Sequence, residues 1–276
     1  MTQGFLVLDK PAGITSRAAV NHAQVWFPGQ KLGHAGTLDP AATGVLILAV
    51  GSQAARLLEY VQDQPKEYIT TIRLGATSTT DDADGEITPQ AYSSPPTTDE
   101  LNTHLQAFRG TLEQVPPSFS AARLDGERAH HKARRGEKVV LAPRLVTVHC
   151  SKGTYIRSLA RDLGRALNCG GYVLSLRRIR IGHVSWELAL SWNATTEEAR
   201  QHLYPLHLAV AHLPKVHSHR EDARRLLCGQ LLPAADLPQG TVSLWWEKHF
   251  LGVGEVDAEK RLLRPRKMMM ANLPGE

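Results

Sequence analysis

The sequence predicts an α+β protein in which a mixed, largely antiparallel sheet with flanking helices is followed by a small β domain. Strand candidates alternate with helix candidates over residues 1–205, whereas residues 206–276 show short strands with turns and one helix. The 276 residues, 42% of them hydrophobic, are enough for one large domain or two. We therefore expect a larger domain over residues 1–205 and a smaller one over residues 206–276.

The first elements follow from turn and capping signals. Phe5–Leu8 is a short apolar strand candidate, and Asp9–Gly13 is a turn with Pro and Gly in suitable places. Thr15 or Ser16 is expected to cap a helix that runs to about Trp26.

The stretch Lys31–Gly51 joins a Gly-rich segment to an apolar run. The segment that ends near Asp39 contains too much glycine for regular structure and is predicted to be a loop. Val45–Val50 is short, apolar and partly β-branched, which is typical of a buried strand. One carboxylate is thus expected on a loop held by a rigid scaffold, where functional groups are often placed.

The middle of the chain continues this alternation. Residues 54–61 are predicted to form a helix, and the polar and apolar alternation of Lys66–Gly75 predicts a half-buried strand. Thr77–Gly85 is a polar loop whose acids we interpret as a turn with Asx-type hydrogen bonds rather than a metal site. Further elements are expected as a helix capped by Thr98 or Asp99 and ending at Phe108, a strand at Leu145–His149, a helix at Ser158–Leu167, a strand at Tyr172–Ile181, and helices at Thr195–Leu203 and Glu221–Cys228.

Lysine and arginine are concentrated in residues 116–144 and again in 151–180. A basic run is usually a solvated helix face, but residues 116–144 could also form a mobile arm that grips phosphates. The net charge of +5 and the pI of about 9.2 permit a polyanionic partner. An odd number of cysteines, three, without a C-x-x-C pair favours a reducing, cytoplasmic location. The N-terminus does not look like a signal peptide, and no apolar run approaches 18 residues, so we expect no membrane span.

Several catalytic classes lack their motifs. The sequence contains no H-E-x-x-H, no P-loop, no G-x-S-x-G and no dinucleotide-binding glycine pattern after a strand. What remains is Asp39 with His34, Tyr68, and the pair Tyr155 and Arg157. Each of these residues alone is more often structural, since an Asp before Pro commonly belongs to a turn. Together with the basic stretches they are compatible with a carboxylate nucleophile or base that serves a polyanionic substrate.

Over nearly its whole length the chain resembles the TruB family, the bacterial tRNA pseudouridine synthases that modify uridine 55 of the TΨC arm. The signature G-H-A-G-T-L-D-P-A-A-T-G-V-L at residues 33–46 matches that family almost residue for residue. Four further motifs match in order, at Leu8–Gly13, Lys66–Tyr68, Ser151–Leu159 and Leu176–Arg178. Five ordered matches make chance agreement negligible.

The resemblance implies a pseudouridine-synthase fold and assigns the catalytic residues. Asp39 would detach uracil from the ribose and allow its reattachment through C5, by attack on C1′, attack on C6 or a glycal. Arg157 would pair with Asp39 and keep it ionised. Tyr68 would stack on the target base and transfer a proton. An isomerisation of this kind implies neither a metal nor a cofactor.

The resemblance also implies the substrate contacts. The tRNA stem-loop would be recognised by shape and its target base extruded. Residues 116–144 would form the tRNA-gripping insertion and residues 206–276 a PUA-like RNA-binding domain with a basic edge at residues 260–267. The substrate-binding residues would be His34, which enters the stem-loop, Tyr155 and Leu176, which shape the pocket, and Lys10, Lys132, Arg134 and Arg135.

Two alternatives stay open at this stage. The chain could be a non-catalytic RNA-binding or tRNA-folding protein on the same scaffold, or the related guide-dependent enzyme of a multi-protein particle. The intact Asp39, Tyr68 and Arg157 favour catalysis, and the absence of a long extension favours a stand-alone enzyme. We expect a monomer without an obligatory protein partner.

The chain departs from the family between Arg144 and His149, where about two strands are missing. Loss of a hairpin would disturb the sheet that carries Tyr155 and Arg157. We therefore expect that residues of the natural protein are absent from this sequence.

Overall fold

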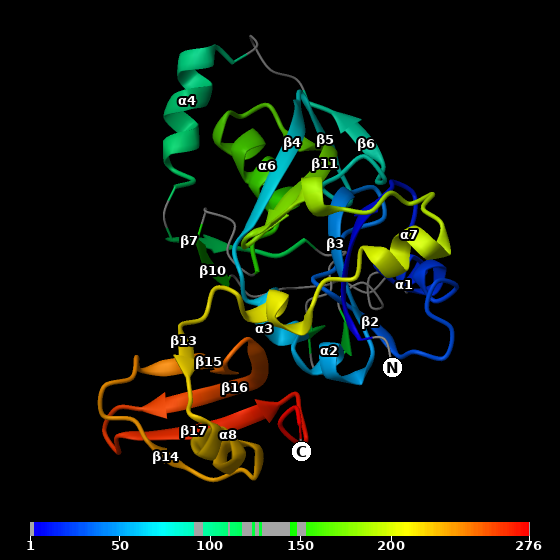
Figure 1. Cartoon of the computed structure of the whole chain (residues 1–276). Helices are drawn as coiled ribbons and strands as arrows, with labels where there is room; N and C mark the ends of the chain where they lie inside the picture. Colours follow the sequence, from blue (N-terminus) through cyan, green and yellow to red (C-terminus); the bar gives the residue numbers. More distant parts are fainter. Residues whose placement is uncertain are drawn as a thin grey trace.

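The structure is a computed structural model that describes residues 3–90, 96–109, 111–117, 123–124, 127–128, 144–147 and 153–275. The larger domain is built on a six-stranded sheet (Figure 1), whose strands are β1 (Gly4–Lys10), β2 (Leu32–Ala35), β3 (Thr43–Val50), β4 (Lys66–Leu74), β11 (Gly171–Ile181) and β12 (Val184–Ser185). β11 runs parallel to β3, and the remaining pairs are antiparallel. The predicted mixed, largely antiparallel sheet is confirmed.

β3 is the centre of the core because both of its faces are covered. Val45, Ile47 and Ala49 belong to one buried cluster, which includes residues of α2 (Ser52–Arg56) and the adjoining α3 (Leu58–Gln62). The intervening residues of β3 belong to a second cluster that includes the inner face of α1 (Ser16–Ala23). A strand buried on both faces has no polar positions, which explains the continuous apolar run.

Three sequence predictions are corrected here. The segment Leu32–Ala35, expected to be loop, is strand β2, because its backbone pairs with β3 from Leu32 opposite Val50 to Ala35 opposite Ile47. Helix α1 ends at Ala23, three residues before the expected end. The single helix expected over residues 54–61 is two short helices that meet at residue 57.

β4 and β11 form a long antiparallel ribbon that carries the upper part of the domain in Figure 1. The exposure of β4 alternates along the strand, as its sequence predicted. The hairpin of β5 (Ala76–Ser78) and β6 (Ile87–Pro89) continues from β4, and α6 (Ile156–Ala166) packs on the ribbon. Helix α4 (Thr98–Gln106) is capped by Thr97 in a capping box with Glu100, and not by Thr98 or Asp99 as expected.

β7 (Thr111–Gln114) and β10 (Arg144–Thr147) form a separate antiparallel pair, and β8 (Arg123–Leu124) pairs with β9 (Glu127–Arg128). The predicted substrate residues Lys132, Arg134 and Arg135 lie outside the described residues. The shortened stretch between Arg144 and His149 is described only as far as Thr147.

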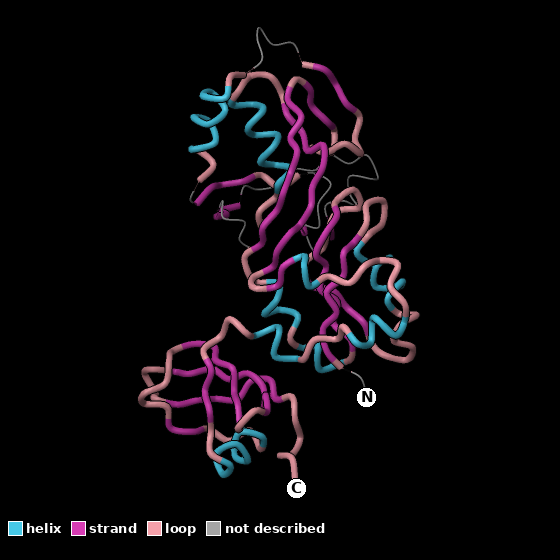
Figure 2. The backbone as a smooth tube through the Cα atoms, turned by 45° about the horizontal axis from the view of Figure 1, so that its top comes forward, coloured by secondary structure: helices cyan, strands magenta, loops and turns pink. Residues whose placement is uncertain are grey.

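The C-terminal part contains helix α8 (Arg220–Leu227) and its own five-stranded sheet, seen as the lower body in Figures 1 and 2. The strand order is β13 (Lys215–His217), β15 (Gly240–Trp246), β16 (His249–Asp257), β17 (Leu262–Met268) and β14 (Leu232–Pro233). A core separate from the two clusters of the larger domain includes Leu226 of α8 together with Leu244, Val256 and Leu263. Helix α7 (Thr196–Gln201) precedes this part. The chain also contains two 3₁₀ helices, η1 (Trp186–Leu188) and η2 (Leu206–Val210).

The end of β17 contacts the larger domain. Lys267 forms an ion pair of 2.9 Å with Glu59, and the Gln53 amide donates a 2.9 Å hydrogen bond to the Met269 carbonyl. Met269 is buried in the same cluster as Val45. Across the described ranges, the chain forms no helix with the length and apolar character that a membrane crossing requires.

Candidate active site

The loop that carries Asp39 lies where the sheet divides. β2 pairs with residues 47–50 of β3, and β11 pairs with residues 43 and 44, so the loop leaves the sheet between β2 and β11. The Ser16 hydroxyl accepts from the Leu38 N–H at 2.9 Å and donates to the Leu38 carbonyl at 3.0 Å. The Lys10 ammonium donates to the Pro40 carbonyl at 3.2 Å. Both neighbours of Asp39 are therefore held by side chains from the start of the chain.

Gly44 allows β3 to approach β11 closely beneath this loop. Its φ of +101° is unfavourable for residues with a side chain, and a Cβ there would lie 2.2 Å from the Arg178 carbonyl oxygen. The glycine of the signature is therefore required by backbone contact.

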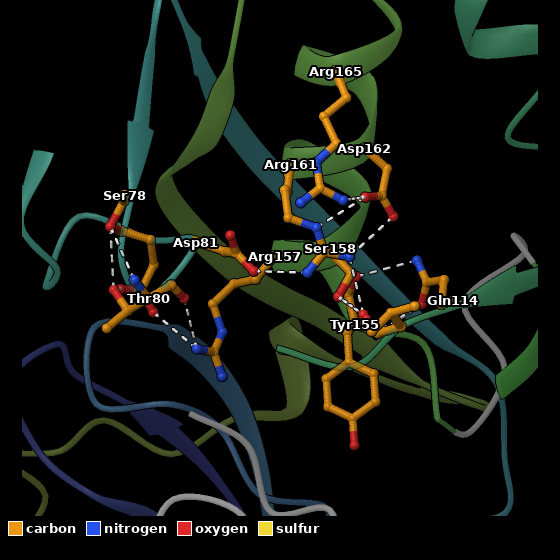
Figure 3. Close-up of polar contacts among 12 residues, drawn as sticks. Ser78, Thr80, Asp81, Gln114, Tyr155, Arg157, Ser158, Arg161, Asp162 and Arg165 are labelled. Atoms are coloured by element: carbon orange, nitrogen blue, oxygen red, sulfur yellow. Dashed lines mark hydrogen bonds and ion pairs between the residues drawn. The ribbon is translucent and has the colours of Figure 1, made fainter. Parts of the chain in front are cut away.

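Asp39 faces a buried arginine from the first turn of α6. Arg157 Nε lies 3.0 Å from Asp39 Oδ2, and the Arg157 side chain is only 7% exposed. The same guanidinium donates to the Thr80 carbonyl at 3.0 Å and lies 3.4 Å from Asp82 Oδ2. Arg157 thus links the Asp39 loop to the loop that follows β5, as Figure 3 shows for its Thr80 contact.

The pKa of Asp39 is raised above the ordinary aspartate value. Burial is the largest cause, and the nearby charge of Asp82 acts in the same direction. Arg157 lowers the pKa through its charge and its hydrogen bond, without reversing the balance. Arg157 does favour the ionised form of Asp39, as expected, but the effect of burial on the pKa is larger.

A cavity of about 130 Å³ opens beside this ion pair. It brings together five of the residues selected from the sequence, since it is lined by Thr37, Leu38, Asp39, Tyr68, Thr154, Tyr155, Ile156, Arg157 and Leu176. Asp39 comes from the loop before β3, Tyr68 from β4, Leu176 from β11, and Tyr155 from the position just before α6. The cavity is therefore assembled from four segments that are distant in the sequence.

Arg178 supports this cavity from inside the sheet. It is 1% exposed and lies opposite Tyr68 in the β4–β11 register. Its guanidinium donates to the carbonyls of Val45 at 2.8 Å and Gly36 at 3.0 Å. Burial lowers the pKa of Arg178. The sequence placed Arg178 in a motif but assigned it no role.

Two predicted substrate residues do not line the cavity. Lys10 was expected to bind substrate, but its side chain is fully buried and its ammonium donates to the carbonyls of Pro11, Ile14 and Pro40 at 2.8, 2.9 and 3.2 Å. Burial lowers the pKa of Lys10 to about 8. The ammonium is directed to backbone carbonyls and not outward, which corrects the prediction. His34 is half-buried on β2.

The acidic residues of the loop after β5 pair with arginines of α6, in addition to the turn role that the sequence predicted. Asp82 does form the expected Asx-type turn, accepting hydrogen bonds from the Thr80 hydroxyl at 2.5 Å and the Asp84 N–H at 3.1 Å. It also faces Arg157, and Asp81 pairs with Arg161 at 2.9 Å (Figure 3). The available signal was the i, i+4 spacing of Arg157 and Arg161, which places two guanidinium groups on one face of a helix, where anionic partners are needed if they are buried.

Within the described ranges, no three His, Cys, Asp or Glu side chains gather as a metal site would require.

Comparison with known proteins agrees with this geometry. The profile of the "TruB family pseudouridylate synthase (N terminal domain)" matches residues 25–158, that of the "tRNA pseudouridylate synthase B C-terminal domain" residues 157–211, and that of "Pseudouridine synthase II TruB, C-terminal" residues 214–269. A protein of Cereibacter sphaeroides named tRNA pseudouridine synthase B is 42% identical, with 86% of each chain covered. The chain belongs to the TruB family of pseudouridylate synthases. Pseudouridine synthases are isomerases, so membership gives this chain its enzyme class.

Other relatives and solved structures extend the comparison. A protein of the same name from Synechococcus sp. strain CC9311 is 40% identical, covering 97% of this chain and 98% of its own. That alignment spans 293 positions, more than the 276 residues here, so the relative contains residues without a counterpart in this TruB-family chain.

A chain in the crystal structure of a Cbf5–Nop10–Gar1 complex matches with a TM-score of 0.75 at 23% identity, covering 97% of this chain and 85% of that one. One in an H/ACA ribonucleoprotein bound to a substrate RNA gives 0.71 at 22%, with the same shares covered. Both confirm the α+β fold.

Proposed function

We propose that this chain isomerises uridine 55 in the TΨC arm of tRNA to pseudouridine, in the cytoplasm. The observation that carries the proposal is the Asp39–Arg157 ion pair in the wall of a cavity that two tyrosines also line. The relatives that share more than 80% of their length with this chain are named tRNA pseudouridine synthase B, which identifies the substrate class.

Asp39 is the catalytic carboxylate in this proposal. The N1–C1′ bond breaks, the C5–C1′ bond forms, the proton on C5 is lost and N1 gains a proton, so the product is an isomer. Asp39 assists cleavage of the N1–C1′ bond by attacking C1′, by attacking C6 or by acting through a glycal intermediate. Its partner Arg157 is held from the other side by Thr80 and Asp82, which fixes the carboxylate in direction as well as in charge.

The cavity determines how the base is held. Tyr68 lies on the cavity wall, opposite Arg178 in the β4–β11 register, which suits it for stacking on uracil and for accepting the C5 proton. Tyr155 and Leu176 bound the remaining space. A base inside a stacked loop cannot reach Asp39 and cannot rotate, so it must be extruded. His34, half-buried on β2, is the residue proposed to occupy the space that the base leaves.

The remaining assignments concern the tRNA as a whole. We propose a catalytic domain over residues 1–205 and a PUA-like RNA-binding domain over residues 206–276 whose basic strand β17 faces phosphates. Residues 116–144 would grip the tRNA through Lys132, Arg134 and Arg135. The enzyme would act as a monomer without a protein partner or cofactor.

The test uses an unmodified tRNA transcript and purified protein. Pseudouridine at position 55 is expected from the parent and not from Asp39→Asn, which preserves shape while removing the charge. Absence of product from the parent, or equal product from the variant, would overturn the proposal. Replacing Lys132, Arg134 and Arg135 by Ala is expected to weaken tRNA binding and to reduce its salt dependence.

A further inference from the structure

The end of β7 is bound by one face of the segment that begins α6. Gln114 exchanges two hydrogen bonds with the backbone of Tyr155. The Val115 carbonyl accepts hydrogen bonds from Ser158 and Arg161. Tyr155, Ser158 and Arg161 are spaced three apart, so they lie on the same side of the helix start. Figure 3 shows Gln114 directed at Tyr155, with Ser158 and Arg161 following on the same face.

Gln114 holds the backbone of Tyr155. Its Oε1 accepts from the Tyr155 N–H at 3.1 Å, and its Nε2 donates to the Tyr155 carbonyl at 3.3 Å. Tyr155 is the N-cap residue of α6 and has an extended backbone, and its own side chain makes no capping hydrogen bond. The Gln114 side chain thus does for Tyr155 what a neighbouring strand would do. Gln114 is 3% exposed, so loss of this pairing would leave a buried amide unsatisfied.

The Val115 carbonyl holds the next turn. It accepts from the Ser158 hydroxyl at 2.8 Å and from the Arg161 guanidinium at 3.0 Å. Arg161 also pairs with Asp81, in the loop whose next residue, Asp82, faces Arg157. The contacts of Val115 are therefore continuous with those that hold the arginine partner of Asp39.

We propose that Gln114 is a positioning residue for the isomerisation, acting through Tyr155. Gln114 does not line the cavity, whereas Tyr155 does. The direction of the Tyr155 ring follows from its backbone, which Gln114 fixes at both polar groups. A displacement of about 1 Å in such a group costs up to about a hundredfold in rate. The inference depends on the proposed function, because the rate it concerns is that of pseudouridine formation.

The first test compares Gln114→Met with Gln106→Met. Methionine keeps the length and apolar stem of glutamine but makes neither hydrogen bond to Tyr155, and Gln106 is exposed on α4. Single-turnover rates of pseudouridine formation are measured at saturating tRNA, together with the Kd for tRNA and the Tm. We expect a tenfold to hundredfold lower rate for Gln114→Met, with a Kd within about twofold of the parent, and no change for Gln106→Met. An unchanged rate, or a loss confined to Kd, overturns the proposal.

A double-mutant cycle separates positioning from general stability. If Gln114 acts through the Tyr155 ring, Gln114→Met lowers the rate much less in a Tyr155→Leu background than in the parent. Equal effects in the two backgrounds overturn the proposal. Should Gln114→Met not fold, Ser158→Ala, which removes one hydroxyl from the same contact, is expected to lower the rate severalfold at unchanged Kd, and an unchanged rate counts against the proposal. A parent that forms no pseudouridine would instead refute the proposed function.

Discussion

Replacing Asp82 by Asn isolates the ion pair between Asp82 and Arg157, the arginine that also contacts Asp39. Asp82 Oδ1 accepts from the Thr80 hydroxyl and the Asp84 N–H, while Oδ2 faces Arg157 at 3.4 Å. Asparagine can keep the first oxygen and place an amide in place of the second. The turn is then expected to persist while the attraction to Arg157 is lost.

The expected loss of rate is bounded by the 3.4 Å separation of Arg157 and Asp82. Two unit charges 3.4 Å apart in surroundings with an effective dielectric constant near 20 attract each other by about 5 kcal/mol, an upper bound because desolvation opposes it. Arg157 keeps its contacts with Asp39 and Thr80, so we expect only part of this energy to affect the reaction. A tenfold to hundredfold slower reaction corresponds to about 1.4 to 2.7 kcal/mol.

Asp82→Asn is also expected to change the pH dependence of the rate, through the pKa of Asp39. The charge of Asp82 raises the pKa of Asp39, so its removal lowers that pKa. If Asp39 acts as the carboxylate, the parent loses activity as the pH falls through its raised pKa. In Asp82→Asn this acid limb should move to lower pH, although the maximal rate is smaller.

The assay is single-turnover pseudouridine formation at saturating tRNA over a pH series. Asp84→Asn is the matched control, because it removes a charge from the same loop on an exposed side chain. It should keep the maximal rate and shift the acid limb only slightly. A maximal rate unchanged in Asp82→Asn, or an acid limb displaced to higher pH, would refute the reasoning.

Two further predictions concern stability. Burial raises the pKa of Asp39, so its charge opposes folding at neutral pH; Asp39→Asn should have a higher Tm than the parent at pH 7, and the difference should vanish as the pH falls through the raised pKa. A lower Tm at pH 7 would contradict this. Lys10→Met removes the donor from three backbone carbonyls and should cost about 3 kcal/mol in urea unfolding. Because the pKa of Lys10 is lowered from 10.5 to about 8, the unfolded parent binds more protons than the folded parent between these pH values. The stability of the parent relative to this variant should therefore increase as the pH rises from about 8 to 10.5; a constant difference would argue against it.

Much of the site was accessible from local sequence patterns. The uniform apolar run of β3 predicted a buried strand, and the structure covers it on both faces. The signature around Asp39 predicted a carboxylate on a constrained loop. Capping and alternation located α1 and β4 to within a few residues. These features depend on neighbours along the chain, and motif matching therefore also recovered Tyr155 and Leu176 as cavity residues.

The features that failed depend on partners far away in the chain. β2 is a strand only because β3 offers it hydrogen bonds, and glycine content alone cannot reveal that. Lys10 was expected to bind substrate, but the fold surrounds its ammonium with carbonyls from two loops. Asp82 looked like a turn residue, and only its proximity to Arg157 gives it a second role.

The sequence by itself thus determined the family, the α+β class and the identity of the central carboxylate, because each is written in contiguous motifs. The tertiary structure decided how that carboxylate is held. The β4–β11 register sets Tyr68 beside Arg178, and the Val173 N–H bonds the Asp81 carbonyl and fixes the acidic loop near α6. The physical reason is that charge pairing and burial are set by distances between segments, which the spacing of residues along the chain does not encode.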